Sequence, residues 1–307
     1  MIYQQTVKRE ITIHGIGLHS GKEAKVTIKP ARPNRGIVFF RGDLEGRPEI
    51  SAHYKNIVNT QLATTLGRGH ASISTVEHLL AALQILGIDN VLIEVSGPEV
   101  PILDGSAQVF CEAIRQAGIE SQSQPRAVLS LRRRVEVRSG EKIASVEPCS
   151  RLEILASVEW SHPSVGPQEF HYIEGKTPYS ELARARTFGF LRDVEALKRM
   201  GLARGGSLDN AIVLDETSVL NPEGLRYTDE FVRHKVLDAL GDLKLAGIAL
   251  QGFVRLHRAG HELHSKLLCE IFRDPENYEI IDPQHQLDRF STRIQTALAR
   301  TNMAATV

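Results

Sequence analysis

Hydrophobic and polar residues alternate with a helical period in the stretch from Thr228 to Gly247. Thr228 is an acceptable N-cap, and the two acidic residues that follow it suit the positive end of a helix dipole. The apolar positions recur every three or four residues and form one stripe: Val232, Val236, Ala239, Leu240 and Leu243. The pattern therefore predicts a helix that begins at Thr228 and ends at Gly247.

Three polar residues fall on the other side of this predicted helix at successive steps of four: His234, Asp238 and Asp242. Each is turned only about 40° from the last, so an imidazole and a carboxylate one turn apart can reach the same point. Such a pair offers two ligands to a metal ion, with a further carboxylate behind them to orient the imidazole. A solvated polar face is the alternative interpretation, and a third ligand has to come from elsewhere.

In the first half of the chain, apolar runs predict strands at 5–13, 22–29, 36–40 and 90–95. Helical patterns occupy 72–87 and 104–118. The following stretch, 120–126, is polar and contains Ser121, Ser123 and Pro125, so we expect it to link two domains.

The second half repeats this order of elements. Strands are predicted at 127–131, 135–137, 142–146, 152–158, 211–214 and 253–257, and helices at 178–182, 193–200, 228–247 and from His264 to Phe272. Strands followed by helices in each half predict an α+β fold of two similar two-layer domains, at 1–120 and 126–307. Too few residues are identical between the halves to establish a sequence repeat.

Composition narrows the class of protein. Lysine and arginine together number 37, as do aspartate and glutamate. The formal net charge is therefore zero and gives no reason to expect binding to nucleic acid or to an anionic membrane. No apolar run has the length of a membrane span, and residues 1–10 lack the apolar core of a signal peptide. The three cysteines are far apart and lack C-x-x-C spacing, which is typical of reduced thiols. We therefore expect a cytoplasmic enzyme with no nucleic-acid partner and no stable membrane anchor.

Glu77 and His78 are candidates to complete the metal site. Glu77 has capping-box spacing from Ser74 and would then bond back to the start of its helix. His78 lies among apolar residues and would more often be a core histidine. As a pair, however, they could join the His234 and Asp238 set, with Glu77 beside a metal-bound water where a general base belongs.

Several motifs then occur in a recognisable order. They are HGIGLHSG at 14–21, STVEHL at 74–79, GIDN at 87–90, PILDGS at 101–106, ARARTFGF at 183–190, GGSLDN at 205–210, the 228–247 helix and GH at 260–261. On these motifs the chain resembles the UDP-3-O-acyl-N-acetylglucosamine deacetylases, zinc amidases that commit a nucleotide sugar to lipid A synthesis. The likeness extends from residue 14 to residue 263, nearly the whole chain.

The resemblance implies that the helices of both domains pack together between two outer sheets, with the active site at their junction. It also implies an insert in the second domain, near 191–214, that forms a passage for the acyl chain. The insert has apolar residues suited to such a passage, although core packing accounts for them equally well: Leu191, Val194, Leu197, Met200 and Leu202.

The resemblance further implies roles for individual residues. His78, His234 and Asp238 would bind Zn²⁺ and leave a fourth position for water, as in catalytic zinc sites. Glu77 would be the general base. His261 would be the companion acid, which stabilises the oxyanion or protonates the departing amine.

Other residues would support the reaction or bind substrate. Thr187 would donate its hydroxyl to the oxyanion, and Asp242 would act behind the metal site. Lys235 would bind a substrate phosphate, and Phe188 would line the sugar and acyl side.

The resemblance implies three further assignments. Lys142 corresponds to a basic residue near the nucleotide. Trp160 falls where the family tends to have an aromatic residue near the uracil, with core packing as the alternative. His19 is expected near the metal cleft. The chain also departs from the usual Leu-Asn after the GH motif, because it has Leu263-His264, but Gly260 sets the register in favour of His261.

The predicted function is zinc-dependent removal of the acetyl group from an acylated UDP-sugar by a monomeric enzyme. One alternative is a binding protein for nucleotide-sugar lipids that has lost catalysis, although every predicted catalytic residue is present. A metal amidase for another acylated sugar is the other. A cysteine or serine hydrolase is set aside because no cysteine lies within the motifs.

Overall fold

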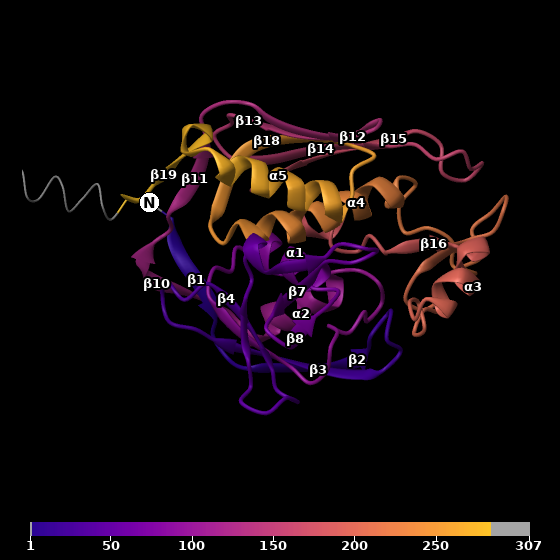
Figure 1. Ribbon diagram of the computed structural model, residues 1–307, viewed down its shortest axis with the longest axis horizontal. Coiled ribbons are helices and arrows are strands. Elements are labelled where there is room, and N and C mark those ends of the chain that lie inside the picture. The colour runs from indigo at the N-terminus through magenta and orange to yellow at the C-terminus, as the bar shows by residue number, and fades with distance from the viewer. Residues whose placement is uncertain (1, 284–307) are drawn as a thin grey trace, which may run out of the picture.

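The computed structural model describes residues 2–283, so the end of the predicted second domain, 284–307, lies outside the described residues. Within them, two large sheets enclose a layer of helices (Figure 1). Strands of the first half form the lower sheet in this view, and strands of the second half form the upper one. The predicted α+β class is confirmed.

The first sheet has five strands in the order β2-β3-β9-β4-β5. Their bounds are Ile11–Ile16 (β2), Glu23–Pro30 (β3), Ile37–Arg41 (β4), Glu49–Ser51 (β5) and Val91–Val95 (β9). In β9, Val91, Ile93 and Val95 are fully buried and alternate with half-buried residues, as expected of a strand with one face toward the core. That core also contains helices α1 (Glu77–Ile85) and α2 (Gln108–Ala117).

The second sheet has seven strands, with β18 pairing with three others. The bounds are Val128–Leu131 (β11), Val135–Ser139 (β12), Lys142–Glu147 (β13), Leu152–Val158 (β14), Gln168–Ile173 (β15), Ala249–His257 (β18) and Tyr278–Ile281 (β19). Helices α4 (Glu230–Leu243) and α5 (His261–Arg273) pack on it.

Helix α4 is buried on nearly every side because it lies between this sheet and α1 (Figure 1). The two helices approach so closely that a Cβ at Gly241 would lie 2.0 Å from the carbonyl oxygen of Glu77. The polar side of α4 is therefore enclosed, and each of His234, Asp238 and Asp242 is only 2% exposed. The interpretation of this side as a solvated face is wrong.

Smaller elements complete the described chain. They are β1 (Tyr3–Val7) paired with β10 (Ile119–Pro125), the sheet of β6 (Ile57–Asn59), β7 (Thr65–Arg68) and β8 (Ala71–Ile73), the parallel pair β16 (Phe188–Phe190) and β17 (Ile212–Leu214), helix α3 (Leu191–Arg199), and the 3₁₀ turns η1 (Tyr54–Asn56), η2 (Tyr179–Glu181), η3 (Lys244–Ala246) and η4 (Pro275–Asn277). In Figure 1, β16 and α3 project to the right of the two sheets. No helix among residues 2–283 has the length and apolar character needed to cross a membrane.

Several predicted boundaries are wrong. The stretch 120–126 is mostly strand β10 rather than a loop, and it lacks an apolar alternation because most of its side chains are exposed. Helix α1 begins at Glu77, five residues after the predicted start at 72. Helix α4 begins at Glu230 with Asp229 as its N-cap, so Thr228 does not cap it. The strands β7, β8, β15, β16 and β19 were not predicted, and the single strand predicted at 5–13 is two strands in different sheets, β1 and β2.

Candidate active site

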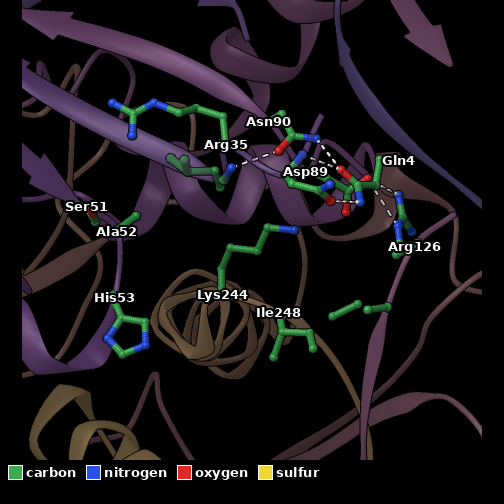
Figure 2. Close-up of a pocket in the computed structure, with 16 residues that line it drawn as sticks. Gln4, Arg35, Ser51, Ala52, His53, Asp89, Asn90, Arg126, Lys244 and Ile248 are labelled. Carbon is green, nitrogen blue, oxygen red and sulfur yellow. Dashed lines mark hydrogen bonds and ion pairs between the residues drawn. The ribbon is translucent and has the colours of Figure 1, made fainter. Parts of the chain in front are cut away.

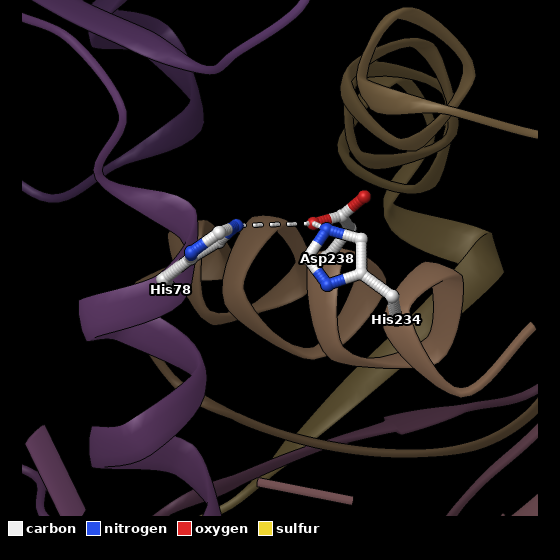
Figure 3. Close-up of side chains that lie close together, drawn as sticks. All are labelled: His78, His234 and Asp238. Carbon is white, nitrogen blue, oxygen red and sulfur yellow. Dashed lines mark ion pairs between the residues drawn. The ribbon is translucent and has the colours of Figure 1, made fainter. Parts of the chain in front are cut away.

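Helices α1 and α4 bring the three predicted metal ligands together. His78 lies in the first turn of α1, and His234 and Asp238 lie one turn apart on α4 (Figure 3). The Oδ1 atom of Asp238 is 3.2 Å from His234 Nε2 and 3.7 Å from His78 Nε2. One potential ligand atom from each residue lies within 4.8 Å of the other two. A single metal ion could therefore contact all three side chains.

The chemistry of these groups also suits a divalent cation. Burial, with the nearby His234, lowers the pKa of His78 to about 3, so its imidazole is neutral, the form that binds metals. Burial raises the pKa of Asp238, but His234 and Lys235 outweigh it and hold that pKa well below its usual range. Asp238 Oδ1 is buried and has no hydrogen-bond partner among the described residues. A buried carboxylate oxygen without a partner is unfavourable unless a cation binds it.

Glu77 lies beside this set and does not cap its helix. Its carboxylate accepts a hydrogen bond from the backbone N–H of Thr64 at 3.0 Å, whereas the Ser74 hydroxyl accepts one from Thr65. Burial raises the pKa of Glu77 to about 8, although His261 opposes the shift. The capping-box interpretation is wrong. Glu77 instead lines the same cavity as His78, His234 and Asp238, called the metal cavity below, and its pKa is perturbed there.

Asp242 holds two imidazoles behind the cavity. Its Oδ2 atom is 2.7 Å from His261 Nδ1 and 2.8 Å from His264 Nδ1, and its Oδ1 atom accepts a 2.5 Å hydrogen bond from the Thr64 hydroxyl. Burial of His261 lowers its pKa, but the charge of Asp242 and its hydrogen bond outweigh burial and raise the pKa to about 9. His261 is therefore a cation at neutral pH, with Nε2 3.9 Å from Asp238 Oδ2.

The predicted substrate residues line the same cavity, which has a volume of about 380 Å³. Lys142, Trp160, Thr187, Phe188 and Lys235 are all on its wall. Trp160 packs edge-on against Phe188, with ring centroids 5.3 Å apart. Lys235 Nζ is 2.7 Å from Asp238 Oδ2 and 5.4 Å from the Phe188 ring centroid.

His19 faces a second, apolar cavity of about 500 Å³, which shares Thr187 and Phe188 with the first. Three of the predicted apolar residues of the insert line it: Leu191, Val194 and Leu197. Met200 and Leu202 do not line it, and Met200 is 61% exposed. His19 is buried, and its Nδ1 accepts a 3.3 Å hydrogen bond from the backbone N–H of Ala203.

Thr64 is the residue that the sequence analysis missed. Its backbone binds Glu77 and its hydroxyl binds Asp242, so it connects the predicted base to the carboxylate behind the predicted acid. It lies between β6 and β7, 13 residues before Glu77, and no local pattern marks it. His264 was noted as an unusual residue, but its bond to Asp242 was not predicted.

Comparison with known proteins identifies the family. Residues 4–273 match the sequence profile of the family described as LpxC: UDP-3-O-acyl N-acetylglycosamine deacetylase. The chain belongs to this family. A UDP-3-O-acyl-N-acetylglucosamine deacetylase of Myxococcus xanthus (strain DK1622) is 49% identical over 279 residues, which cover 91% of this chain and 89% of that one. The resemblance inferred from the motifs is confirmed.

Two further relatives carry the same name. That of Geobacter sp. (strain M21) is 48% identical over 284 residues, which cover 92% of this chain and 93% of the relative. That of Helicobacter pylori (strain J99) is 44% identical over 279 residues, with 91% and 94% covered. The likeness to the deacetylase family therefore extends over nearly the full length of each relative.

Proposed function

We propose that this protein hydrolyses the N-acetyl group of UDP-3-O-acyl-N-acetylglucosamine. The products are acetate and UDP-3-O-acyl-glucosamine, and the reaction is the committed step of lipid A biosynthesis. The observation that carries the proposal is the meeting of three groups in one buried cavity: a carboxylate, an imidazolium and a set of metal ligands. The apolar cavity that adjoins it suits an acyl chain.

The proposed metal is Zn²⁺, held by His78, His234 and Asp238. Two imidazoles and one carboxylate are a common ligand set of catalytic zinc, which leaves a position open for water or substrate. Such an ion lowers the pKa of water and polarises a carbonyl group.

The residues of the chain move the protons. Glu77 accepts a proton from the attacking water while the oxygen of that water forms a bond to the acetamide carbon. His261 donates a proton to the amide nitrogen as the carbon–nitrogen bond breaks, and its charge is held in place by Asp242. Positive charge at the metal ligands favours the ionised form of Glu77, which its task as a base requires. Thr187, on the wall of the cavity, is proposed to donate a hydrogen bond to the oxyanion.

The substrate is proposed to lie across both cavities. Lys235 and Lys142 suit the diphosphate by charge, and Trp160 and Phe188 offer aromatic faces to the uracil and the sugar. Lys235 pairs with Asp238 here. A cation bound at Asp238 would compete for that carboxylate and leave Lys235 to a phosphate.

Acetate release from UDP-3-O-acyl-N-acetylglucosamine tests the proposal. We expect a chelator to abolish activity and zinc to restore it, and Glu77→Gln to abolish it with zinc still bound. Turnover that survives complete removal of the metal would contradict the metal mechanism. Substrate binding without turnover by the zinc-loaded wild type would favour a binding protein instead. Turnover of other acylated sugars alone would favour a different amidase.

We also propose how the chain is organised. Two sheets, each built from strands of one half of the chain, support two domains, divided at 120–126. We also propose a monomer in the cytoplasm, on the sequence features described above. A dimer mass by light scattering, or recovery with membranes on cell fractionation, would contradict these two proposals.

A further inference from the structure

A further cavity, of about 380 Å³, is drawn in Figure 2. It shares no lining residue with the metal cavity. Residues from both halves of the chain form its wall, among them His53 and Asn90 from the first half and Arg126 and Lys244 from the second. Lys244 follows directly after α4, the helix that carries His234 and Asp238.

Most charged and polar groups around this cavity already have partners. Asp89 Oδ2 accepts hydrogen bonds from Arg126 Nη2 and from the backbone N–H of Gln5, both at 2.8 Å. Arg35 pairs with Glu49 at 2.6 Å. Asn90 Oδ1 accepts a 2.7 Å hydrogen bond from the backbone of Gly36. These bonds hold the wall together.

Lys244 is different. Its ammonium group has neither a hydrogen bond nor an ion pair with any residue from 2 to 283, and Figure 2 shows its side chain extending into the cavity. Burial lowers the pKa of this lysine to about 8, although Asp89 opposes the shift. A half-buried ammonium without a partner is unfavourable, and an anion in the cavity would relieve that cost.

His53 supplies a second donor on the same wall. Its Nδ1 atom accepts a 3.3 Å hydrogen bond from the backbone N–H of Lys55, so in the neutral ring the proton is on Nε2. In the described part of the chain, no group accepts a hydrogen bond from that Nε2. The ring lies beside Tyr54, with ring centroids 4.5 Å apart, and lines the cavity.

We propose that this cavity binds a small anion that carries a phosphate or carboxylate group, with Lys244 as its charge partner and His53 as a hydrogen-bond donor. The volume is within the range of small-molecule sites, roughly 300–1,000 Å³. Because the two donors come from different halves of the chain, the bound anion links the first half to the end of α4. It therefore stabilises the folded enzyme next to the catalytic helix.

Calorimetric titration of the zinc-loaded full-length protein with inorganic phosphate or malonate tests this site, with chloride keeping the ionic strength constant. Lys244→Met removes the charge and keeps an aliphatic stem. We expect it to weaken binding at least tenfold. Lys176→Met is the matched control, because Lys176 is an exposed lysine outside the cavity, and it should bind as the wild type does.

Lys235→Met separates the two cavities, because it removes the lysine of the metal site. Loss of binding in Lys235→Met but not in Lys244→Met would place the anion in the metal cavity and overturn the proposal. Equal binding by wild type and Lys244→Met would overturn it too, as would no binding of either probe at millimolar concentrations. If Lys244→Met fails to fold, His53→Phe takes its place, and unchanged affinity in that variant counts against the site. The tighter of the two probes identifies the ligand as a phosphate or a carboxylate.

Discussion

The metal cavity and the Lys244 cavity have the same volume, about 380 Å³, and opposite electrostatic needs. In the metal cavity the buried atoms without a hydrogen-bond partner include Asp238 Oδ1 and His78 Nδ1. In the other cavity the ammonium of Lys244 has neither a hydrogen bond nor an ion pair with any of residues 2–283. A bound cation would stabilise the anionic oxygen of Asp238, and a bound anion would stabilise the ammonium of Lys244. The sign of the unpaired group, rather than the size of the cavity, indicates what each can bind.

Both cavities depend on α4, which passes between them. His234, Asp238 and Asp242 lie along the helix, and Lys244 follows its last residue. A rigid helix would couple the two sites, whereas a helix that frays near Leu243 would keep them independent.

Asp238→Asn should have the largest effect. It removes the charge of the proposed ligand and keeps the shape, so metal affinity and activity should fall together, by about three powers of ten or more in kcat/KM. Metal content by atomic emission and acetate release are the measurements. Anion binding at Lys244 should remain as in the wild type. A variant that keeps stoichiometric zinc and near-normal turnover would show that Asp238 is not a ligand.

Gly241→Ala should affect both cavities through the packing of α4 on α1. The added Cβ would lie 2.0 Å from the carbonyl oxygen of Glu77, so the helices must separate. We expect unfolding to become easier by about 1–3 kcal/mol, with weaker zinc binding. Chemical denaturation and metal titration measure the two effects. Gly189→Ala serves as a control, because its added Cβ would meet no atom within 4 Å among residues 2–283, its two chain neighbours aside. Wild-type stability in Gly241→Ala would contradict the close packing of the two helices.

His264→Phe should act on the metal cavity alone. Asp242 would lose one of its two imidazole donors, and His261 would be held less firmly. Loss of such an outer hydrogen bond reduces activity by roughly 10–100-fold in other metal sites. His264→Asn retains a donor and should recover most of the rate. Equal loss in both variants would mean that the ring of His264, rather than its hydrogen bond, is what matters.

The sequence predicted the site better than the boundaries of the elements. His234, Asp238 and Asp242 follow from the period of one helix, so their convergence was predictable once the helix was recognised. The bonds of Asp242 to His261 and His264 join α4 to α5. The order of motifs indicated the roles of Asp242 and His261, but neither bond was predicted. Thr64 could not be predicted, because its two contacts depend on how α1 and α4 pack.

Strands β10 and β16 were missed for a related reason. A strand is recognised in a sequence by the alternation that burial of one face imposes. Most side chains of β10 are exposed, and all three residues of β16 are half-buried, so neither strand carries that alternation. The Lys244 cavity is invisible in the sequence as well. Its wall comes from segments between Gln4 and Ala249, and nothing near Lys244 in the chain marks it as unpaired.

Lys244→Met should have the smallest effect in the absence of an anion, and it should be stabilising. The pKa of this lysine falls from 10.5 in the ordinary state to about 8 in the folded protein. Below pH 8 both states carry the proton and the folded state bears the full penalty, so methionine should add on the order of 1–2 kcal/mol to the free energy of unfolding. Between pH 8 and 10.5 the unfolded chain binds more protons, so the wild type gains stability with rising pH and the advantage of methionine shrinks. Denaturation of both proteins across this range, with Lys176→Met as control, measures it. An advantage that is absent at pH 7, or that does not change with pH, would mean that Lys244 has a partner in solution, and the contrast between the two cavities would fail.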